Sequence, residues 1–304
     1  MSRFQLAAVL FLAVPFFTAC SFSRIASNLT SGIMKSGQPI MEEESDIEVA
    51  EQSSVAMIKT LEVFYRHNPD NETFLFLLSK SYGSYSFGFL ENRLLEFKNK
   101  DPQRFAVYEE RAKLFYLRGK EYGLKYIERR DKGLRRAIDQ GLVKLREELS
   151  HTGKGDLEAL FWTAFNWGNY INLTKDSVRS VSDLTLVEAM MARVMELDPN
   201  YLYGGPHLFY GVYYGSSPPM LGGNPEQARK HFESAAKTSE GKMLMTMVLE
   251  AQVLAVQLQD RELFDRLLGQ VEEGSIEAIP EQRMANVLAK ERARLLRENA
   301  KNYF

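Results

Sequence analysis

Cysteine is almost absent from this sequence, and with it the structures that depend on several cysteines. The only one is Cys20 among 304 residues, which excludes an intrachain disulfide and a metal cluster held by cysteines. An excess of either charge is missing too, because 38 lysine and arginine residues face 40 aspartate and glutamate residues, a formal net charge of −2. Without a basic excess to neutralise phosphates, nucleic acid is not an expected partner.

Catalytic motifs are also missing. The four histidines, His67, His151, His207 and His231, are scattered, and no two of them stand four positions apart as in a zinc protease. The sequence contains no Gly-x-Ser-x-Gly motif around a nucleophilic serine and no glycine-rich phosphate loop. Its 40 acidic residues include many carboxylate pairs, but the sequence alone does not place two of them across a cleft. We therefore predict a protein that is not an enzyme, with no cofactor and no metal site.

The N-terminal stretch resembles the signal peptide of a bacterial lipoprotein. Arg3 gives it a short positive end, the apolar run 6–17 is too short to span a bilayer, and Thr18-Ala19 leads into Cys20. In this class the peptide is cleaved before the cysteine, and acyl chains such as palmitate then attach that residue to the membrane. The alternatives are an ordinary secretory signal with an incidental cysteine and a disordered tail. We expect a signal peptide at 1–19 and a lipid on Cys20.

Small and polar residues fill the stretch that follows, and we expect a lipidated tether at 20–44. Such a protein belongs to the bacterial cell envelope and faces the periplasm. Ser21 in the second mature position favours the outer membrane by the sorting rule of enteric bacteria. In other bacteria the inner membrane stays an alternative. The folded domain is expected at 45–304, and it begins where Ser45 forms a capping-box pattern with Glu48.

Apolar residues recur at helical spacing through this domain, and no segment carries a convincing alternating strand pattern. The fold class is therefore predicted as all-α, a stack of helical hairpins. The segment 126–149 is strongly charged, which is typical of a solvated helix face. The other expected helices lie at 45–67, 71–88, 102–119, 156–171, 184–197, 206–216, 225–235, 243–259 and 262–273, with a charged terminal helix at 281–299 that can cap the stack.

The stretch 201–241 indicates a helical hairpin around which the chain is organised. Gly204-Gly205 breaks the preceding structure and Pro206 suits the first turn of a helix. Asn224 can cap a second helix that starts at Pro225. The same spacing of small, aromatic and small residues on one helix face occurs twice, at Ala228, Phe232 and Ala235 and at Ala112, Tyr116 and Gly119.

This hairpin resembles the tetratricopeptide repeat, a helix pair that stacks on like pairs into a solenoid. Gly211 and Tyr214 on its first helix, followed by the small-aromatic-small face of the second, carry the resemblance. The loop between the helices is about five residues longer than the repeat allows, and His207 stands where its tryptophan is expected. We therefore expect a degenerate, tetratricopeptide-like solenoid.

Several segments together resemble the T component of tripartite ATP-independent periplasmic (TRAP) transporters, over about 48–273. The lipoprotein signal, Phe161-Trp162-Thr163-Ala164-Phe165-Asn166-Trp167-Gly168, Leu197-Asp198-Pro199-Asn200 and Pro219-Met220-Leu221-Gly222-Gly223 carry this similarity. The resemblance implies an envelope lipoprotein, a homotrimer, that associates with the periplasmic solute-binding subunit of such a transporter. It also implies a secondary transporter, driven by an ion gradient and not by ATP.

The helix expected at 156–171 is apolar around most of its circumference, so it is either buried on several sides or lines a cavity. Alignment with a standard repeat places four side chains on the groove side of the stack, and the unusual loop adds a fifth. These candidates for a ligand or partner groove are Trp167, Tyr170, Leu208, Val212 and Met220. The groove is expected to hold or pass on a small apolar or amphipathic organic acid. The alternative for each residue is helix packing.

A rival interpretation is a tetratricopeptide scaffold lipoprotein for outer-membrane or cell-wall assembly. Its groove would bind extended peptides and should be polar, whereas a cavity for a small molecule should be apolar. The many aromatic residues of this sequence favour the transport interpretation.

Overall fold

The computed structural model describes residue 24 and residues 26–175, 177–216 and 222–304. These residues are mostly helical and contain no strand, so the predicted all-α fold is confirmed. Residues 26–36 form a helix ahead of the labelled elements. The α-helices are α2 (Gln38–Glu42), α3 (Ile47–His67), α4 (Glu72–Tyr85), α5 (Glu91–Phe97), α6 (Pro102–Arg130), α7 (Lys132–Gln140), α8 (Leu142–Leu149), α9 (Leu157–Asn172), α10 (Val178–Ser182), α11 (Leu184–Leu197), α12 (Tyr201–Gly215), α13 (Pro225–Thr238), α14 (Leu244–Leu249), α15 (Val256–Leu258), α16 (Arg261–Glu273) and α17 (Arg283–Glu298), and the π-helical turns η1 (Ser86–Leu90) and η4 (Glu250–Ala255) continue α4 and α14.

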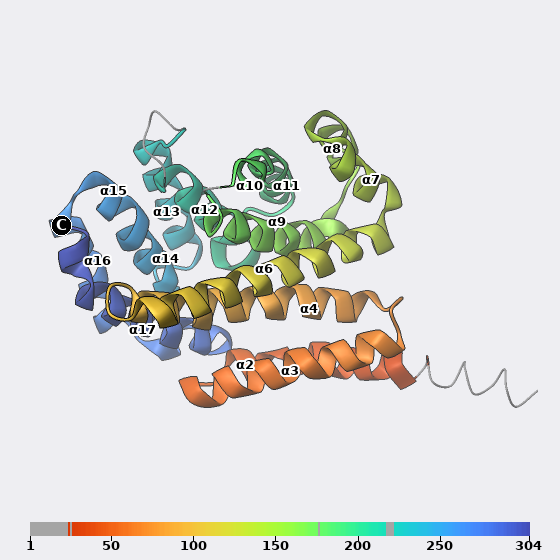
Figure 1. Cartoon of the computed structure of the whole chain (residues 1–304), viewed down its shortest axis with the longest axis horizontal. Helices are drawn as coiled ribbons and strands as arrows, with labels where there is room; N and C mark the ends of the chain where they lie inside the picture. Colours follow the sequence, from red (N-terminus) through yellow and green to blue (C-terminus); the bar gives the residue numbers. More distant parts are fainter. Residues whose placement is uncertain (1–23, 25, 176, 217–221) are drawn as a thin grey trace, which may run out of the picture.

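Consecutive helices pack against each other, and the pairs stack side by side. α3 packs on α4, α4 on α6, α6 on α9, and α9 on α11. Figure 1 shows the helices α3, α4, α6 and α9 as successive layers. α12 and α13 form the next pair, followed by α14 and α16. This arrangement confirms the predicted stack of helical hairpins.

Side-chain caps fix where several helices begin. Asn71, Asp101 and Asn224 accept hydrogen bonds from backbone N–H groups in the first turns of α4, α6 and α13, which confirms the cap predicted at Asn224. The predicted start at Ser45 is wrong by one residue. Asp46 caps α3, and its Oδ1 accepts from two N–H groups of the first turn at 2.9 and 3.1 Å. The extended backbone of Asp46 (φ −83°, ψ 113°) aims its carboxylate at that turn, and Ser45 lies one residue too early.

The central hairpin contains the break that the sequence predicts. Leu202, Tyr203 and Gly204 have left-handed backbones, with φ of 50°, 57° and 87°, and regular helical geometry resumes after them in α12. Further along α12, a Cβ atom at Gly211 would lie 2.9 Å from the ring of Phe232 in α13. The two helices therefore approach as closely as the glycine allows.

The last helix closes the stack. α17 packs on α14 and α16, its neighbours in sequence, and also on α5, η1 and α3 from the N-terminal part of the chain. The sequence indicates a terminal helix that caps the stack, whereas the structure shows one that joins its two ends. In the described part of the chain no helix is long and apolar enough to cross a membrane.

Candidate functional site

A cavity of about 490 Å³ lies inside this closed stack. Its wall comes from α2, α4, η1 and α5 on the N-terminal side, from α9 and α12 in the middle, and from α14, η4 and α17 on the C-terminal side. Pockets that hold small molecules in proteins typically measure about 300–1,000 Å³. The cavity exists because α17 brings the C-terminal helices against the first ones.

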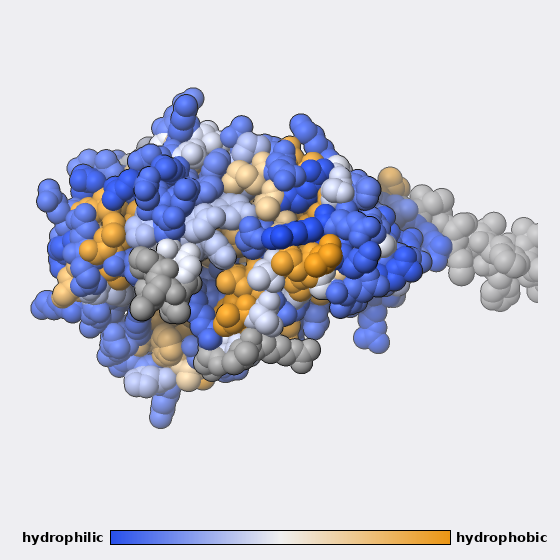
Figure 2. All heavy atoms as spheres, turned by 90° about the horizontal axis from the view of Figure 1, so that it is seen from above, coloured by the Kyte–Doolittle hydropathy of each residue, from blue (hydrophilic) through white to orange (hydrophobic). Residues whose placement is uncertain are grey.

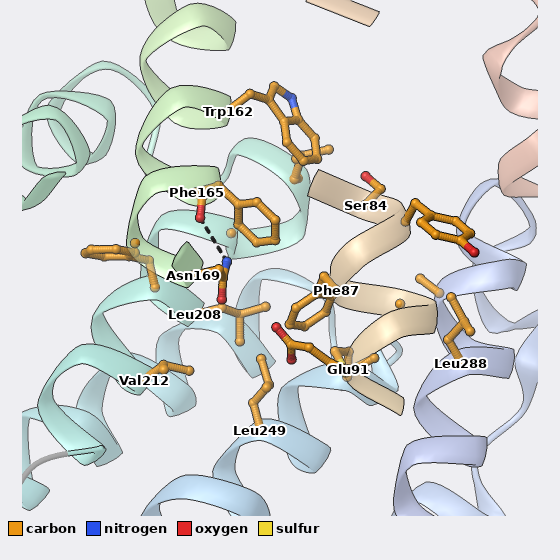
Figure 3. Close-up of a pocket in the computed structure, with 18 of the residues that line it drawn as sticks. Ser84, Phe87, Glu91, Trp162, Phe165, Asn169, Leu208, Val212, Leu249 and Leu288 are labelled. Carbon is orange, nitrogen blue, oxygen red and sulfur yellow. Dashed lines mark hydrogen bonds between the residues drawn. The ribbon is translucent and has the colours of Figure 1, made fainter. Parts of the chain in front are cut away.

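Aromatic and aliphatic side chains form most of the cavity wall. The helix expected at 156–171 was predicted to be buried on several sides or to line a cavity, and α9 does both. It is buried along most of its length and lines the cavity with Trp162 and Phe165. Figure 3 shows Phe87, Leu208 and Leu249 around the same space. Seen from above, an apolar area lies in the middle of the molecule within a mostly hydrophilic surface (Figure 2).

One buried ion pair interrupts the apolar wall. Arg292 of α17 has no exposed surface, and its Nη1 lies 3.4 Å from Oε2 of Glu91, the first residue of α5. The Arg292 Nε donates to the Asn92 side chain at 2.7 Å, and Nη2 donates to the Phe87 carbonyl. The guanidinium carbon also lies 4.4 Å from the centre of the Phe87 ring. The other carboxylate oxygen of Glu91, Oε1, accepts a hydrogen bond from the Tyr116 hydroxyl at 2.5 Å.

The Glu91 carboxyl is held in an environment that opposes its charge. Burial raises its pKa, although Arg292 and the Tyr116 hydroxyl both stabilise the ionised form. About 18% of the Glu91 side chain is accessible, and because this residue lines the cavity, the accessible part faces the cavity. In Figure 3 its carboxylate points into the space next to Leu208 and Leu249.

A second ion pair connects the N-terminal segment to the cavity wall. Lys80 of α4 lies 2.5 Å from Oε1 of Glu42 in α2, and both residues line the cavity. The Arg283 guanidinium donates to the Glu43 carbonyl at 2.6 Å, so α2 is also held from the C-terminal side. Part of the predicted tether at 20–44 therefore contributes to the cavity wall.

The structure brings two of the five predicted groove residues to the cavity. Leu208 and Val212 line it, whereas Trp167 and Tyr170 are not among the lining residues, and Met220 lies outside the described residues, as does Cys20.

Trp167 is packed on another side of α9. Only 5% of its surface is exposed, its indole N–H donates to Asp183 at 3.3 Å, and the Lys120 ammonium lies 3.7 Å from the centre of the ring. Trp162 and Phe165 are three positions apart and share the face that meets the cavity, and Trp167 projects elsewhere. A role for Trp167 and Tyr170 in binding stays a prediction.

Sequence reasoning missed the polar residues of the cavity. Glu91 is one of 40 acidic residues, and no motif marks it. Arg292 stands in a run of charged residues of the kind that normally covers a surface helix. Trp162 lies in a segment that carries the family resemblance, so the sequence did mark this cavity residue. No motif marks Glu91 or Arg292.

Two histidines that are separate in sequence also meet. His207 of α12 and His231 of α13 lie 3.0 Å apart between their Nδ1 atoms, and the His231 ring stacks on Tyr210 and Tyr214. Burial lowers the pKa of both imidazoles, and the neighbouring His207 lowers that of His231 further. Across the described ranges, no group of three or more histidine, cysteine, aspartate and glutamate side chains is arranged to hold a metal ion.

Comparisons with known proteins point to one family. A family model described as "TRAP transporter T-component" matches residues 43–304, which begin just after α2 and include every later helix that lines the cavity. A curated protein of Treponema pallidum (strain Nichols), named "Uncharacterized protein", is 23% identical over 266 residues, which cover 87% of this chain and 82% of that protein.

Proposed function

The chain belongs to the family of TRAP transporter T-components, and we propose that it is a lipoprotein that binds the periplasmic solute-binding subunit of its transporter. Membership makes it an envelope-associated component of a TRAP transporter and not an enzyme. The transporter is of the secondary type, so the proposed role is to hold the solute-binding subunit near the membrane. The proposed assembly is a homotrimer anchored by lipid on Cys20 and facing the periplasm.

The cavity adds a second part to this proposal, that the protein holds a small apolar or amphipathic organic acid and passes it to the solute-binding subunit. The observation that carries it is the cavity of about 490 Å³ with mostly aromatic and aliphatic walls. A scaffold that binds extended peptides needs a polar groove, because peptide N–H and C=O groups must be paired. The proposed ligand or partner contacts are those predicted from the sequence, Trp167, Tyr170, Leu208, Val212 and Met220, of which Leu208 and Val212 line this cavity.

Capture from native membranes tests the partner. The lipidated protein is solubilised under mild detergent and captured, and the proteins that accompany it are identified by mass spectrometry. We expect a stoichiometric periplasmic solute-binding protein. A Cys20→Ser variant, which cannot be lipidated, should leave the membrane fraction but still bind the same subunit when the two are mixed.

The outcome that contradicts the proposal is equally specific. Recovery of outer-membrane assembly or peptidoglycan factors, without a solute-binding protein, would favour the scaffold function. Light scattering on the captured complex then measures the oligomeric state, for which three copies of the chain are expected.

A further inference from the structure

We propose that Glu91, with Arg292 buried behind it, binds the carboxyl group of the cavity's ligand, and that binding takes up one proton, which this carboxyl group shares with Glu91. The inference rests on the proposed ligand-holding function. It adds the position of the head group, the ionisation state of the complex and the class of ligand, an aliphatic or aromatic monocarboxylic acid.

The pair presents a carboxylate to the cavity and holds a buried guanidinium behind it. The buried Arg292 uses Nε and Nη2 for hydrogen bonds, but its Nη1 has no hydrogen-bond partner among the described residues. Oε1 of Glu91 receives the Tyr116 hydroxyl, whereas Oε2 makes the 3.4 Å contact with Nη1. Nη1 has no accessible surface, so the ligand meets Glu91, and the buried positive charge of Arg292 acts on the ligand from behind that carboxylate.

A carboxyl group fits an accessible carboxylate that has a buried positive charge behind it. One of its oxygens can share a proton with Oε2 of Glu91, the oxygen that lies 3.4 Å from Nη1 of Arg292. Two ionised carboxylates at such a distance repel each other strongly in an apolar cavity, and neighbouring carboxyl groups therefore share one proton. With that proton the two groups carry a single negative charge, which Arg292 balances. The proton comes from solvent, and no bond other than the bond to this proton changes.

The surroundings of Glu91 favour this proton. The titratable groups that face it are Tyr116 from α6 and Arg292 from α17. Burial raises the pKa of Glu91 despite both of them, so this carboxyl group takes up a proton more readily than a solvated one. The other charged residues of the cavity wall are Glu42, Lys80 and Lys175.

The rest of the wall defines the body of the ligand. Phe87, Leu208 and Leu249 lie next to the Glu91 carboxylate, and Val212 extends the apolar surface away from it. A hydrocarbon chain or ring attached to the carboxyl group can therefore be buried while the carboxyl group contacts Glu91.

Proton uptake is measured by isothermal titration calorimetry of octanoate against the full chain in lipid nanodiscs, with empty nanodiscs subtracted. The heats measured in phosphate and in Tris at pH 7 differ because the two buffers have different ionisation enthalpies. This difference in heat gives the number of protons taken from the buffer for each octanoate bound. We expect about one proton per octanoate bound. Linkage then predicts that Kd rises roughly tenfold between pH 7 and pH 8.

Two variants separate this mechanism from a structural role. In Glu91→Gln the side-chain amide supplies an N–H to the bound carboxylate, so octanoate should bind without proton uptake and with nearly the same Kd at both pH values. Glu42→Gln changes another carboxylate of the same wall, and it should keep the proton uptake of the unmodified chain. Circular dichroism confirms that each variant is folded.

Octanamide is the neutral probe that distinguishes the two levels of the proposal. Binding of octanoate without proton uptake, or proton uptake that persists in Glu91→Gln, would overturn the shared proton, while binding of octanamide would leave the ligand-holding function in place. If neither octanoate nor octanamide binds the chain or its variants at either pH, the ligand-holding function and the inference both fail.

Discussion

A single asparagine fills the space where α4, α6 and α9 meet. Asn166 has no exposed surface, and its Nδ2 donates to the Ser79 carbonyl at 3.0 Å and to the Trp162 carbonyl at 2.7 Å. A Cβ atom at Gly83 would lie 2.7 Å from its Oδ1, and one at Gly119 would lie 2.2 Å away. The two glycines are therefore required by the amide that they enclose.

Replacement of Gly119 by alanine tests this packing. Alanine favours a helix by roughly 1 kcal/mol over glycine, but a methyl group forced into a filled core costs about 1–3 kcal/mol. Displacement of the buried Asn166 amide also breaks its hydrogen bonds. We expect Gly119→Ala to lower the free energy of unfolding by roughly 1–2 kcal/mol in urea titrations followed by circular dichroism.

The matched control is Gly153→Ala, because nothing lies within 4 Å of its added methyl group and its φ is −127°. This variant should stay within about 0.5 kcal/mol of the unmodified chain. A loss of similar size in both variants would show that the contact with Asn166 is not responsible.

At the scale of elements, the pairing of α12 with α13 contains the histidine contact as well as the small-aromatic-small face. A hydrogen bond between two imidazoles requires one nitrogen without a proton, so the contact between His207 and His231 is lost when both rings are protonated. The sequence predicted the face from local spacing. It did not predict the histidine contact, because His207 and His231 stand on different helices, 24 positions apart.

This contact predicts a dependence of stability on pH. The pKa of both imidazoles is lowered in the folded chain, so the unfolded chain binds these protons more readily. The free energy of unfolding should therefore fall as pH is lowered from about 7 through the ordinary histidine value near 6.5 and on through the lowered values. His231→Phe keeps an aromatic ring beside Tyr210 but removes one titrating group, and its Tm should fall less between pH 7.5 and pH 5 than that of the unmodified chain.

The control replaces a histidine outside this contact. His151 is exposed in a turn, and His151→Phe should therefore keep the pH dependence of the unmodified chain. Equal losses of Tm in all three proteins would contradict a role for the contact between α12 and α13.

At the scale of the whole molecule, α17 makes the difference between an open stack and a closed one. Helix spacing, caps and breaks are local, and for this reason the sequence predicted the central hairpin and most of the longer helices. Two of its five groove candidates, Leu208 and Val212, line the cavity. Closure is not local, since the contact of Arg292 with Asn92 spans 200 residues of chain. Nothing in the charged pattern of α17 distinguishes the buried Arg292 from a surface arginine, so the cavity and its ion pair could not be predicted.

Closure has a consequence for unfolding. In an open solenoid each repeat contacts only its neighbours, and a local defect loosens the structure locally. Here Leu288 of α17 packs against Gly88, and its carbonyl accepts from Asn92 at 3.4 Å, so this side chain lies where the two ends join. We expect Leu288→Ala to cost about 2–5 kcal/mol of the free energy of unfolding and to speed amide hydrogen exchange in both α5 and α14.

The control is Leu145→Ala, in a buried site of α8 that packs on α7 and α11. It should cost a similar amount but speed exchange only in those helices. Faster exchange confined to α17 in the first variant would mean that the two ends unfold independently, as in an open solenoid.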